Sequence, residues 1–267
     1  MNQMNSKQLD SVCPSPTRHY VPKPLPGTGA RIGLITLATD SGSEPEWWDM
    51  VPGHDVALYV SRIQYDSNCT PESLRAMGDD MTRAASMLPD NLYLDAIAYS
   101  CTSGTTAIGH QNVVDRIQAA HPGVPVATPI SGACGALKCL GASKVAVVTP
   151  YTDIVNETIQ AYLENEGLTI TGMVGFSLIR DEDLARLPLE AIMEAIDEVL
   201  TPESEAIFLS CTGLVVVNDI PAIEEKFGLP VITSNQAMFW EALRASGYTK
   251  PIKGFGRLLS SAQQLDT

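Results

Sequence analysis

The sequence predicts an α/β protein whose chain folds into two similar halves, each built around a parallel sheet. Two observations predict this class: short apolar runs rich in Val and Ile that lack clean polar and apolar alternation, and helical patterns between them. Runs of this kind are typical of strands buried on both faces. They lie at residues 31–38, 55–63, 94–100, 124–130, 144–150, 168–176, 205–210, 229–234 and 251–259.

The segments between these runs carry apolar residues at spacings of three and four, which is the pattern of a helix packed on a sheet. The pattern is clear at residues 74–88, 155–163 and 184–199. Strands that alternate with helices predict right-handed crossover units in doubly wound layers.

The chain also repeats itself. The segment LDAIAYSCTSGT (94–105) is echoed by EAIFLSCTGL (205–214), and residues 124–141 are echoed in the same order by residues 229–247. A repeat of roughly 100 residues suits a duplicated domain better than a solenoid unit.

This repeat sets the expected domain boundaries. We expect a first half at residues 31–141, a second half at residues 142–249, and a last strand at residues 251–260 that could return to the first half. Residues 1–30 hold five prolines and no hydrophobic period, so they are predicted to form a flexible tail.

Charge and hydropathy narrow the classes of partner. With 17 Lys and Arg against 31 Asp and Glu, the formal charge is −14, and no basic cluster appears, so we expect no nucleic-acid partner. No apolar stretch approaches the ~18 residues of a membrane-spanning helix, and the N-terminus lacks a basic region followed by an apolar segment. We therefore expect a soluble cytoplasmic protein that does not enter the membrane.

Two of the six cysteines occupy matched positions in the repeat. Cys101 and Cys211 each follow a predicted strand, at the edge of an open α/β sheet where ligands bind. Small polar residues come next, Thr102 and Ser103 in one half and Thr212 in the other, and such turns expose backbone N–H groups that hold anions. We expect their positive field to lower the pKa of both thiols.

Two thiols that face one ligand can share a reaction. One removes a proton or adds to carbon while the other delivers a proton from the opposite face, and this chemistry requires neither metal nor nicotinamide. The alternative is that cysteine is a small apolar core residue. The matched placement of Cys101 and Cys211 favours the functional interpretation.

Other residues with reactive or bulky side chains are interpreted more simply. Cys134 and Cys139 have no counterpart in the second half and are assigned to packing, and Cys69, in a loop, is given no role. The four histidines stand singly, without the spacing of metal ligands. Asn235 is interpreted as a helix cap, and the Trp47–Trp48 pair either as a lid or as packing between the halves.

Five segments in order, RIGLITLATD, AYSCTSGT, VTPYTDIVN, LSCTGL and GFGRLL, resemble the aspartate/glutamate racemase superfamily. Within it, they are most similar to the branch that contains maleate cis-trans isomerase, arylmalonate decarboxylase and ectoine-utilisation protein A. The resemblance covers residues 31–260. It implies two flavodoxin-like halves related by a pseudo-two-fold axis, a buried site between them, cofactor-independent chemistry and a homodimer.

The resemblance also implies roles for individual residues. Cys101 would add to the double bond of maleate and Cys211 would protonate the neighbouring carbon, whereas in the racemases the same two positions exchange an α-proton. The decarboxylases have Gly at the first position, so Cys101 argues against decarboxylation. The residues expected to bind the substrate carboxylates are Thr102, Ser103, Tyr151 and Thr212.

Asp40 departs from the maleate isomerase pattern, which has Asn at this place. An ionised Asp beside a dicarboxylate is unfavourable because like charges repel, whereas a substrate with an amino or amide group would suit it. We therefore include Asp40 among the substrate-binding candidates. The alternative role is that of a helix N-cap or turn residue.

Three functions remain open at this point. The leading hypothesis is a two-cysteine isomerase of a small carboxylate, similar to maleate isomerase. The second is a racemase of an amino acid or N-acetyl-diamino acid, of the ectoine-utilisation type. The third is a non-catalytic binding protein on the same scaffold, which the presence of both cysteines disfavours.

Overall fold

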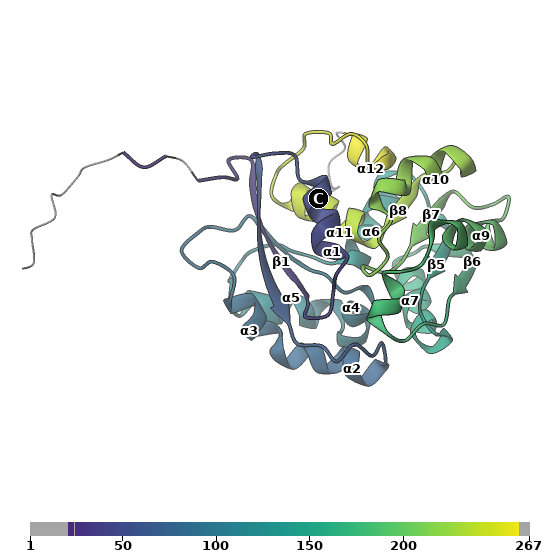
Figure 1. The fold of residues 1–267 in the computed structure, drawn as a ribbon, viewed down its shortest axis with the longest axis horizontal. Helices are drawn as coiled ribbons and strands as arrows, with labels where there is room; N and C mark the ends of the chain where they lie inside the picture. Colours follow the sequence, from purple (N-terminus) through teal and green to yellow (C-terminus); the bar gives the residue numbers. More distant parts are fainter. Residues whose placement is uncertain (1–20, 24, 262–267) are drawn as a thin grey trace, which may run out of the picture.

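Two four-stranded parallel sheets form the framework of the molecule (Figure 1). The computed structural model describes residues 21–23 and 25–261. The strand order is β2-β1-β3-β4 in one sheet and β6-β5-β7-β8 in the other, so both sheets have the same arrangement. The strands are β1 (Ala30–Leu37), β2 (Val56–Ile63), β3 (Ala96–Tyr99), β4 (Val126–Ala127), β5 (Lys144–Thr149), β6 (Thr169–Gly175), β7 (Ala206–Leu209) and β8 (Val231–Thr233). The predicted α/β class is confirmed, and each strand overlaps one of the first eight apolar runs.

Helices connect the strands. Those up to the end of the first sheet are α1 (Ser43–Met50), α2 (Pro71–Ala76), the 3-10 turn η1 (Met77–Asp80), α3 (Met81–Ser86), α4 (Thr102–Ile108), α5 (His110–Gln118) and α6 (Pro129–Cys139). The remainder are α7 (Asp153–Asn165), α8 (Asp181–Leu184), α9 (Leu189–Val199), the 3-10 turn η2 (Val217–Asp219), α10 (Ile220–Phe227), α11 (Ser234–Ala245) and α12 (Gly256–Ser260).

The helices after the fourth strand of each sheet begin in the same way. Thr128 caps α6 and Thr233 caps α11, and in both cases the threonine hydroxyl accepts the N–H of the residue three positions ahead. The side chains of Ser131 and Gln236 complete a capping box in each helix. The cap of α11 is therefore Thr233, and the prediction that Asn235 caps this helix is wrong.

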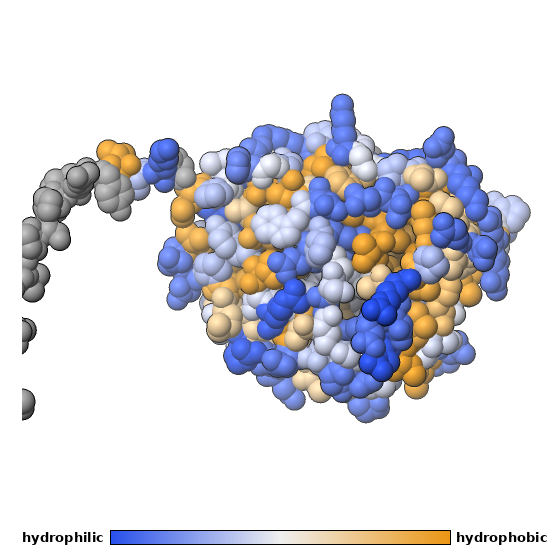
Figure 2. Space-filling view, viewed as in Figure 1, coloured by the Kyte–Doolittle hydropathy of each residue, from blue (hydrophilic) through white to orange (hydrophobic). Residues whose placement is uncertain are grey.

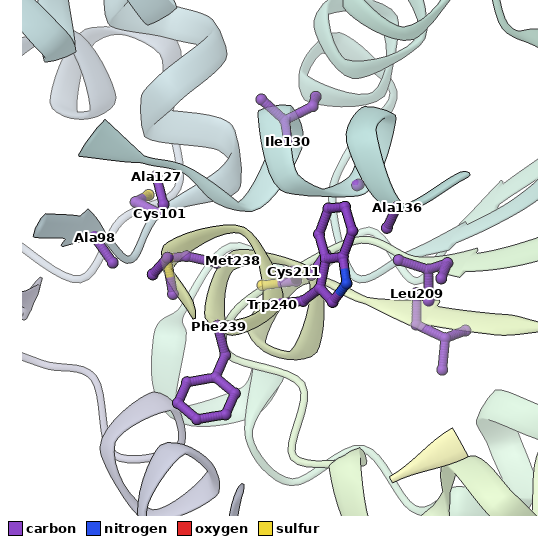
Figure 3. Close-up of a cluster of buried hydrophobic side chains, with 14 of the residues drawn as sticks. Ala98, Cys101, Ala127, Ile130, Ala136, Leu209, Cys211, Met238, Phe239 and Trp240 are labelled. Carbon is purple, nitrogen blue, oxygen red and sulfur yellow. The ribbon is translucent and has the colours of Figure 1, made fainter. Parts of the chain in front are cut away.

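Helix α11 joins the two sheets into one core. Although it follows β8 along the chain, it packs against α6 and against β3 and β4 of the other sheet. Trp47 of α1 meets Phe239 of α11 edge to face, with ring centroids 5.0 Å apart. Figure 3 shows Met238, Phe239 and Trp240 projecting from α11 in different directions into this core. Trp47 therefore packs in the core, whereas Trp48 is exposed.

Residues 251–259 do not form the predicted strand. They contain a turn followed by α12, which packs against α10, α11 and β8, and so lies on the second sheet instead of returning to the first. Gly254 and Gly256 have φ values of 96° and 75°, which no strand residue adopts. The buried Glu224 carboxylate accepts the N–H of Arg257 and holds this segment in place.

Only part of the predicted tail lies among the described residues. Residues 1–20 and 24 fall outside them, while Gly27 and Gly29 donate their N–H groups to the carbonyls of His54 and Asp55. On the face in Figure 2, hydrophobic residues form patches separated by hydrophilic ones. Of the helices in the described ranges, none combines the length and apolarity needed to cross a membrane.

Candidate active site between the two sheets

The loops that follow the corresponding strands β3 and β7 meet at one pocket. Its empty space, open solvent at the mouth included, is about 450 Å³, and both Cys101 and Cys211 line it. Figure 3 shows these two side chains approaching the core from different strands, near α11. The remaining lining residues are Leu37, Thr39, Asp40, Ser41, Gly42, Tyr65, Cys69, Ser103, Tyr151, Asp181, Leu184, Ala185, Thr212 and Gly213.

Both sulfur atoms accept a backbone N–H from the turn that follows them. The Sγ of Cys101 accepts from Gly104 at 3.1 Å, and the Sγ of Cys211 accepts from Gly213 at 3.2 Å. Each side chain is almost fully buried, with 4% and 5% exposed respectively. A backbone N–H stabilises a thiolate more than a thiol, so both turns can support a charged sulfur during reaction.

The expectation of lowered thiol pKa values is nevertheless wrong for the ligand-free pocket. Burial, with smaller contributions from a neighbouring thiol and from the charge of Asp181, raises the pKa of Cys101 and of Cys211 to about 12. The N–H donors and nearby hydroxyls oppose this shift but do not reverse it. Both thiols are therefore protonated at neutral pH, because the closed pocket desolvates a thiolate and no Lys, Arg or His is among the lining residues.

Three of the predicted carboxylate-binding side chains line the pocket. The Tyr151 hydroxyl hydrogen-bonds the Cys211 sulfur and lowers its pKa. The Oγ of Ser103 lies 3.8 Å from the Cys101 Sγ. Thr212 is also in the lining, and its hydroxyl donates to the carbonyl of Ser100 at 3.4 Å. The hydroxyls of Ser103 and Tyr151 therefore lie beside the two sulfur atoms, whereas that of Thr212 is bonded to the main chain.

Thr102, the fourth, is placed differently. It is fully buried, does not line the pocket, and its hydroxyl lies 2.9 Å from that of Ser234 at the start of α11. As the first residue of α4, Thr102 turns its side chain toward α11 while Cys101 faces the pocket. The structure thus gives Thr102 a contact between helices in place of the predicted contact with substrate.

Asp40 lines the pocket and also accepts hydrogen bonds from residues of its own loop. Its Oδ1 accepts the N–H groups of Gly42 and Ser43, and its Oδ2 accepts the hydroxyl of Thr36 at 2.6 Å. This is the turn geometry that was the alternative to substrate binding. The two roles coexist, since the same carboxyl group accepts three hydrogen bonds within its own loop and also lines the pocket.

Sequence reasoning missed the side chains contributed by two facing loops. Residues 64–70 follow β2 and bring Tyr65 and Cys69, whereas residues 176–181 follow β6 and bring Asp181. The loops pair through an antiparallel bridge between Asn68 and Arg180, and the N–H of Cys69 donates to the Ile179 carbonyl. Because β2 and β6 are corresponding strands, the rule that ligands bind at carboxyl edges could have identified both loops.

Asp181 is the second carboxylate of the pocket. It is half-buried, and its Oδ2 accepts the hydroxyl of Thr39 from the other sheet's loop at 2.5 Å. Burial raises its pKa, and the negative charges of Asp40 and Asp66 raise it further. The Sγ of Cys69 lies 3.7 Å from the Ser103 Oγ, so a third thiol stands near the same hydroxyl as Cys101.

Comparison with known proteins places the chain in a family. The family model described as arylmalonate decarboxylase matches residues 67–259. The chain belongs to this family. The resemblance inferred from the five segments is thereby confirmed at the level of the branch.

Individual family relatives match to different extents. The arylmalonate decarboxylase of Bordetella bronchiseptica is 35% identical over 143 residues, which span 52% of this chain and 60% of that protein. The maleate isomerase of Nocardia farcinica is 26% identical over 242 residues, which span 86% and 95%.

Solved structures show the same fold. The maleate isomerase Iso from Pseudomonas putida S16 superposes with a TM-score of 0.81 at 24% identity, covering 88% of this chain and 99% of that one. A cysteine variant of the Nocardia farcinica maleate cis-trans isomerase with a covalently bound succinylcysteine intermediate gives a TM-score of 0.79 at 25% identity, covering 86% and 98%. The two-sheet architecture is therefore that of this family.

Proposed function

We propose that this protein is a cofactor-independent isomerase that transfers a proton at carbon in a small carboxylate bearing an amino or amide group. Cys101 and Cys211 are the proposed acid and base. One observation carries the proposal: both thiols line one closed pocket together with the carboxyl groups of Asp40 and Asp181, and no basic side chain is among the lining residues. A ligand with two negative charges would be repelled there.

The proposed proton transfer needs only the two cysteine sulfur atoms as proton donor and acceptor. One cysteine, as thiolate, takes the proton from the carbon next to the substrate carboxylate, and the other, as thiol, gives its proton to the opposite face of that carbon. The cysteines end in exchanged protonation states. A positively charged amino group beside Asp181 would favour the thiolate form, because an opposite charge lowers a thiol pKa.

Ser103, Tyr151 and Thr212 are the proposed partners of the substrate carboxylate. Their hydroxyl groups line the same pocket as the two thiols and are neutral donors. The site thus offers neutral donors for an anionic group and carboxylates for a cationic one. This combination suits an amino-acid-like ligand.

Maleate isomerisation is the second candidate. It is supported by the match to the Nocardia farcinica maleate isomerase over most of both chains and by the succinylcysteine bound in its cysteine variant. In that reaction the thiolate of one cysteine would bond to one double-bond carbon while the other cysteine protonates the neighbouring carbon. After rotation about the new single bond, loss of that proton and of the thiolate would restore the double bond. The carboxylates of Asp40 and Asp181 disfavour maleate in this pocket. Decarboxylation of an arylmalonate is the activity named for another relative.

Proton exchange in heavy water tests these candidates together. Amino acids, N-acetylated diamino acids, maleate and an arylmalonate are incubated with the protein in D2O and followed by NMR. We expect deuterium at the α-carbon of an amino-bearing compound. Fumarate from maleate, or loss of CO2 from the arylmalonate without exchange elsewhere, would replace the proposal with the corresponding alternative.

A further inference from the structure

A buried carboxylate lies beside the pocket but does not line it. Glu46, on α1, is 1% exposed. Its Oε1 accepts the N–H groups of Val216 and Val217 at 2.5 and 2.6 Å, and its Oε2 accepts the side-chain amide of Asn235 at 2.6 Å. Through these bonds a helix of the first sheet holds a loop of the second.

The same hydrogen bonds reach the residue that follows Cys211. The Asn235 amide that donates to Glu46 also donates to the Thr212 carbonyl at 2.9 Å. Glu46 thus binds the far end of the 212–217 loop directly and its near end through Asn235. Both ends of the loop that follows Cys211 are therefore bound, directly or through Asn235, to one carboxyl group.

The network continues to the residue before Cys101. Ser43, also on α1, donates its hydroxyl to the Thr212 carbonyl at 3.2 Å and accepts the hydroxyl of Ser100 at 2.8 Å. Ser43 and Ser100 are both fully buried. Helix α1 therefore contacts the main chain or side chain next to each of the two pocket cysteines.

We infer that Glu46 is a positioning residue: its carboxylate holds residues 212–217 and so sets where the Cys211 sulfur lies relative to Cys101. This inference rests on the proposed function for its effect on turnover. The Cys101 turn continues directly into α4, whereas residues 212–216 form no helix, so the loop after Cys211 needs support from outside.

The chemistry of the cluster favours a specific role over general packing. All partners of Glu46 are donors, which an ionised carboxylate matches because it only accepts, whereas a protonated carboxyl brings an O–H for which these partners offer no acceptor. Among the described residues, no Lys or Arg forms an ion pair with Glu46. Burial raises its pKa to about 7, because desolvation penalises the charged form more than the three hydrogen bonds stabilise it.

The Glu46→Gln variant tests the inference with little change of shape. Its amide oxygen can still accept from Val216 and Val217, but its NH2 group faces the donating amide of Asn235. We expect the exchange kcat to fall roughly 10- to 100-fold with KM changed less than about threefold, since a small displacement of a reacting group has this effect. The matched control is Glu44→Gln on the same helix, whose carboxylate pairs with Arg62 at 2.8 Å and does not contact the 212–217 loop.

Thiol alkylation tests the position of Cys211 without any substrate. Iodoacetamide labelling at pH 8.5, mapped by mass spectrometry, gives separate rates for Cys211 and Cys101. We expect Glu46→Gln to change the ratio of the two rates at least about fivefold, and Glu46→Asp to give an intermediate ratio. If no compound in the panel is turned over, the proposed function fails while this ratio still decides the inference.

Ser43→Ala provides a second variant if Glu46→Gln does not fold. It removes one donor to the Thr212 carbonyl, and we expect the same direction of change in kcat and in the rate ratio, of about 3- to 10-fold. Two results would overturn the inference: a ratio within about twofold of the wild type in every folded variant, or equal changes at both cysteines together with a lowered melting temperature, which indicate a merely structural role.

Discussion

The turns that follow Cys101 and Cys211 have similar sequences but different structural support. Cys101 caps α4, so the residues after it are held by their own helix. The sulfur of Cys211 also accepts an N–H, from the second residue after it instead of the third, but the residues that follow form an open loop that α1 of the other sheet holds through Glu46 and Ser43. The duplication therefore reproduces the position of the thiol but not its support. The second thiol depends on contacts between the sheets.

Separate replacement of the two cysteines is the strongest test of whether both take part in the reaction. We expect Cys101→Ala and Cys211→Ala each to lower turnover at least roughly 1,000-fold, because each removes a proton donor and acceptor that nothing replaces. NMR exchange rates and circular dichroism measure activity and folding. Cys134→Ala, outside the pocket, is the control. Full activity in either single variant would contradict the paired mechanism.

Asp181→Asn tests the charge that both thiols share. We expect the KM for an amino-bearing substrate to rise roughly 10-fold, because the site loses an ionic partner. The same change should speed alkylation of both cysteines at a given pH, since the Asp181 charge raises both thiol pKa values. Asp183→Asn, exposed on the same short helix, is the control. An unchanged KM would argue against a cationic group on the substrate.

The pH dependence of stability involves two carboxyl groups, the buried Glu46 on α1 and the half-buried Glu241 on α11. Burial raises the pKa of Glu46 and of Glu241 from 4.5 to about 7. The folded protein then binds these protons more tightly than the unfolded chain, so each group lowers the free energy of unfolding as pH rises from about 4.5 to 7, by on the order of 3 kcal/mol.

Urea denaturation of the wild type, Glu46→Gln and Glu241→Gln between pH 5 and pH 8 measures this effect. The free energy of unfolding should fall less between pH 5 and pH 8 in each variant than in the wild type. Only Glu46→Gln should also alter the rate ratio of the two cysteines. Identical pH curves for all three proteins would show that neither carboxyl titrates in this range.

We expect the smallest effects from replacing the threonines that follow the two cysteines. Thr102→Val removes the hydroxyl contact with Ser234, and we expect a loss of about 1 kcal/mol in stability with kcat and KM within about threefold of the wild type. Thr212→Val alters the pocket and should act mainly on KM. If Thr102→Val acted mainly on KM instead, the originally predicted contact of Thr102 with substrate would be favoured.

Much of the fold could be predicted because strands buried on both faces have a plain apolar signature. The first eight of the Val and Ile runs located the eight strands of the described residues, and the repeat identified Cys101 and Cys211 as corresponding residues. The run at 251–259 failed because two glycines with positive φ place it in a turn and a helix. The continuous period over residues 74–88 likewise became α2, η1 and α3, since spacing alone does not mark where a helix breaks.

The site was predicted less completely than the fold. Asp181 and Cys69 come from loops without a recognisable motif, and only the pairing of those loops across the sheets brings them to the pocket. Thr102 lies outside the pocket lining because sequence neighbours of a pocket residue on a helix point in different directions. The thiol pKa direction was wrong because desolvation depends on the closure of the pocket, which no local pattern reports.

The amino-acid sequence by itself determined the succession of strands along the chain, the duplication, and the presence of a thiol after the third strand of each half. These features follow from the hydropathy of short segments and from the similarity between such segments in the two halves. Only the tertiary structure decided that α11 crosses to the other sheet, that Glu46 supports the second thiol, and that two carboxyl groups share the pocket with both sulfurs. Such contacts join residues more than a hundred positions apart, and their energies depend on burial and distance.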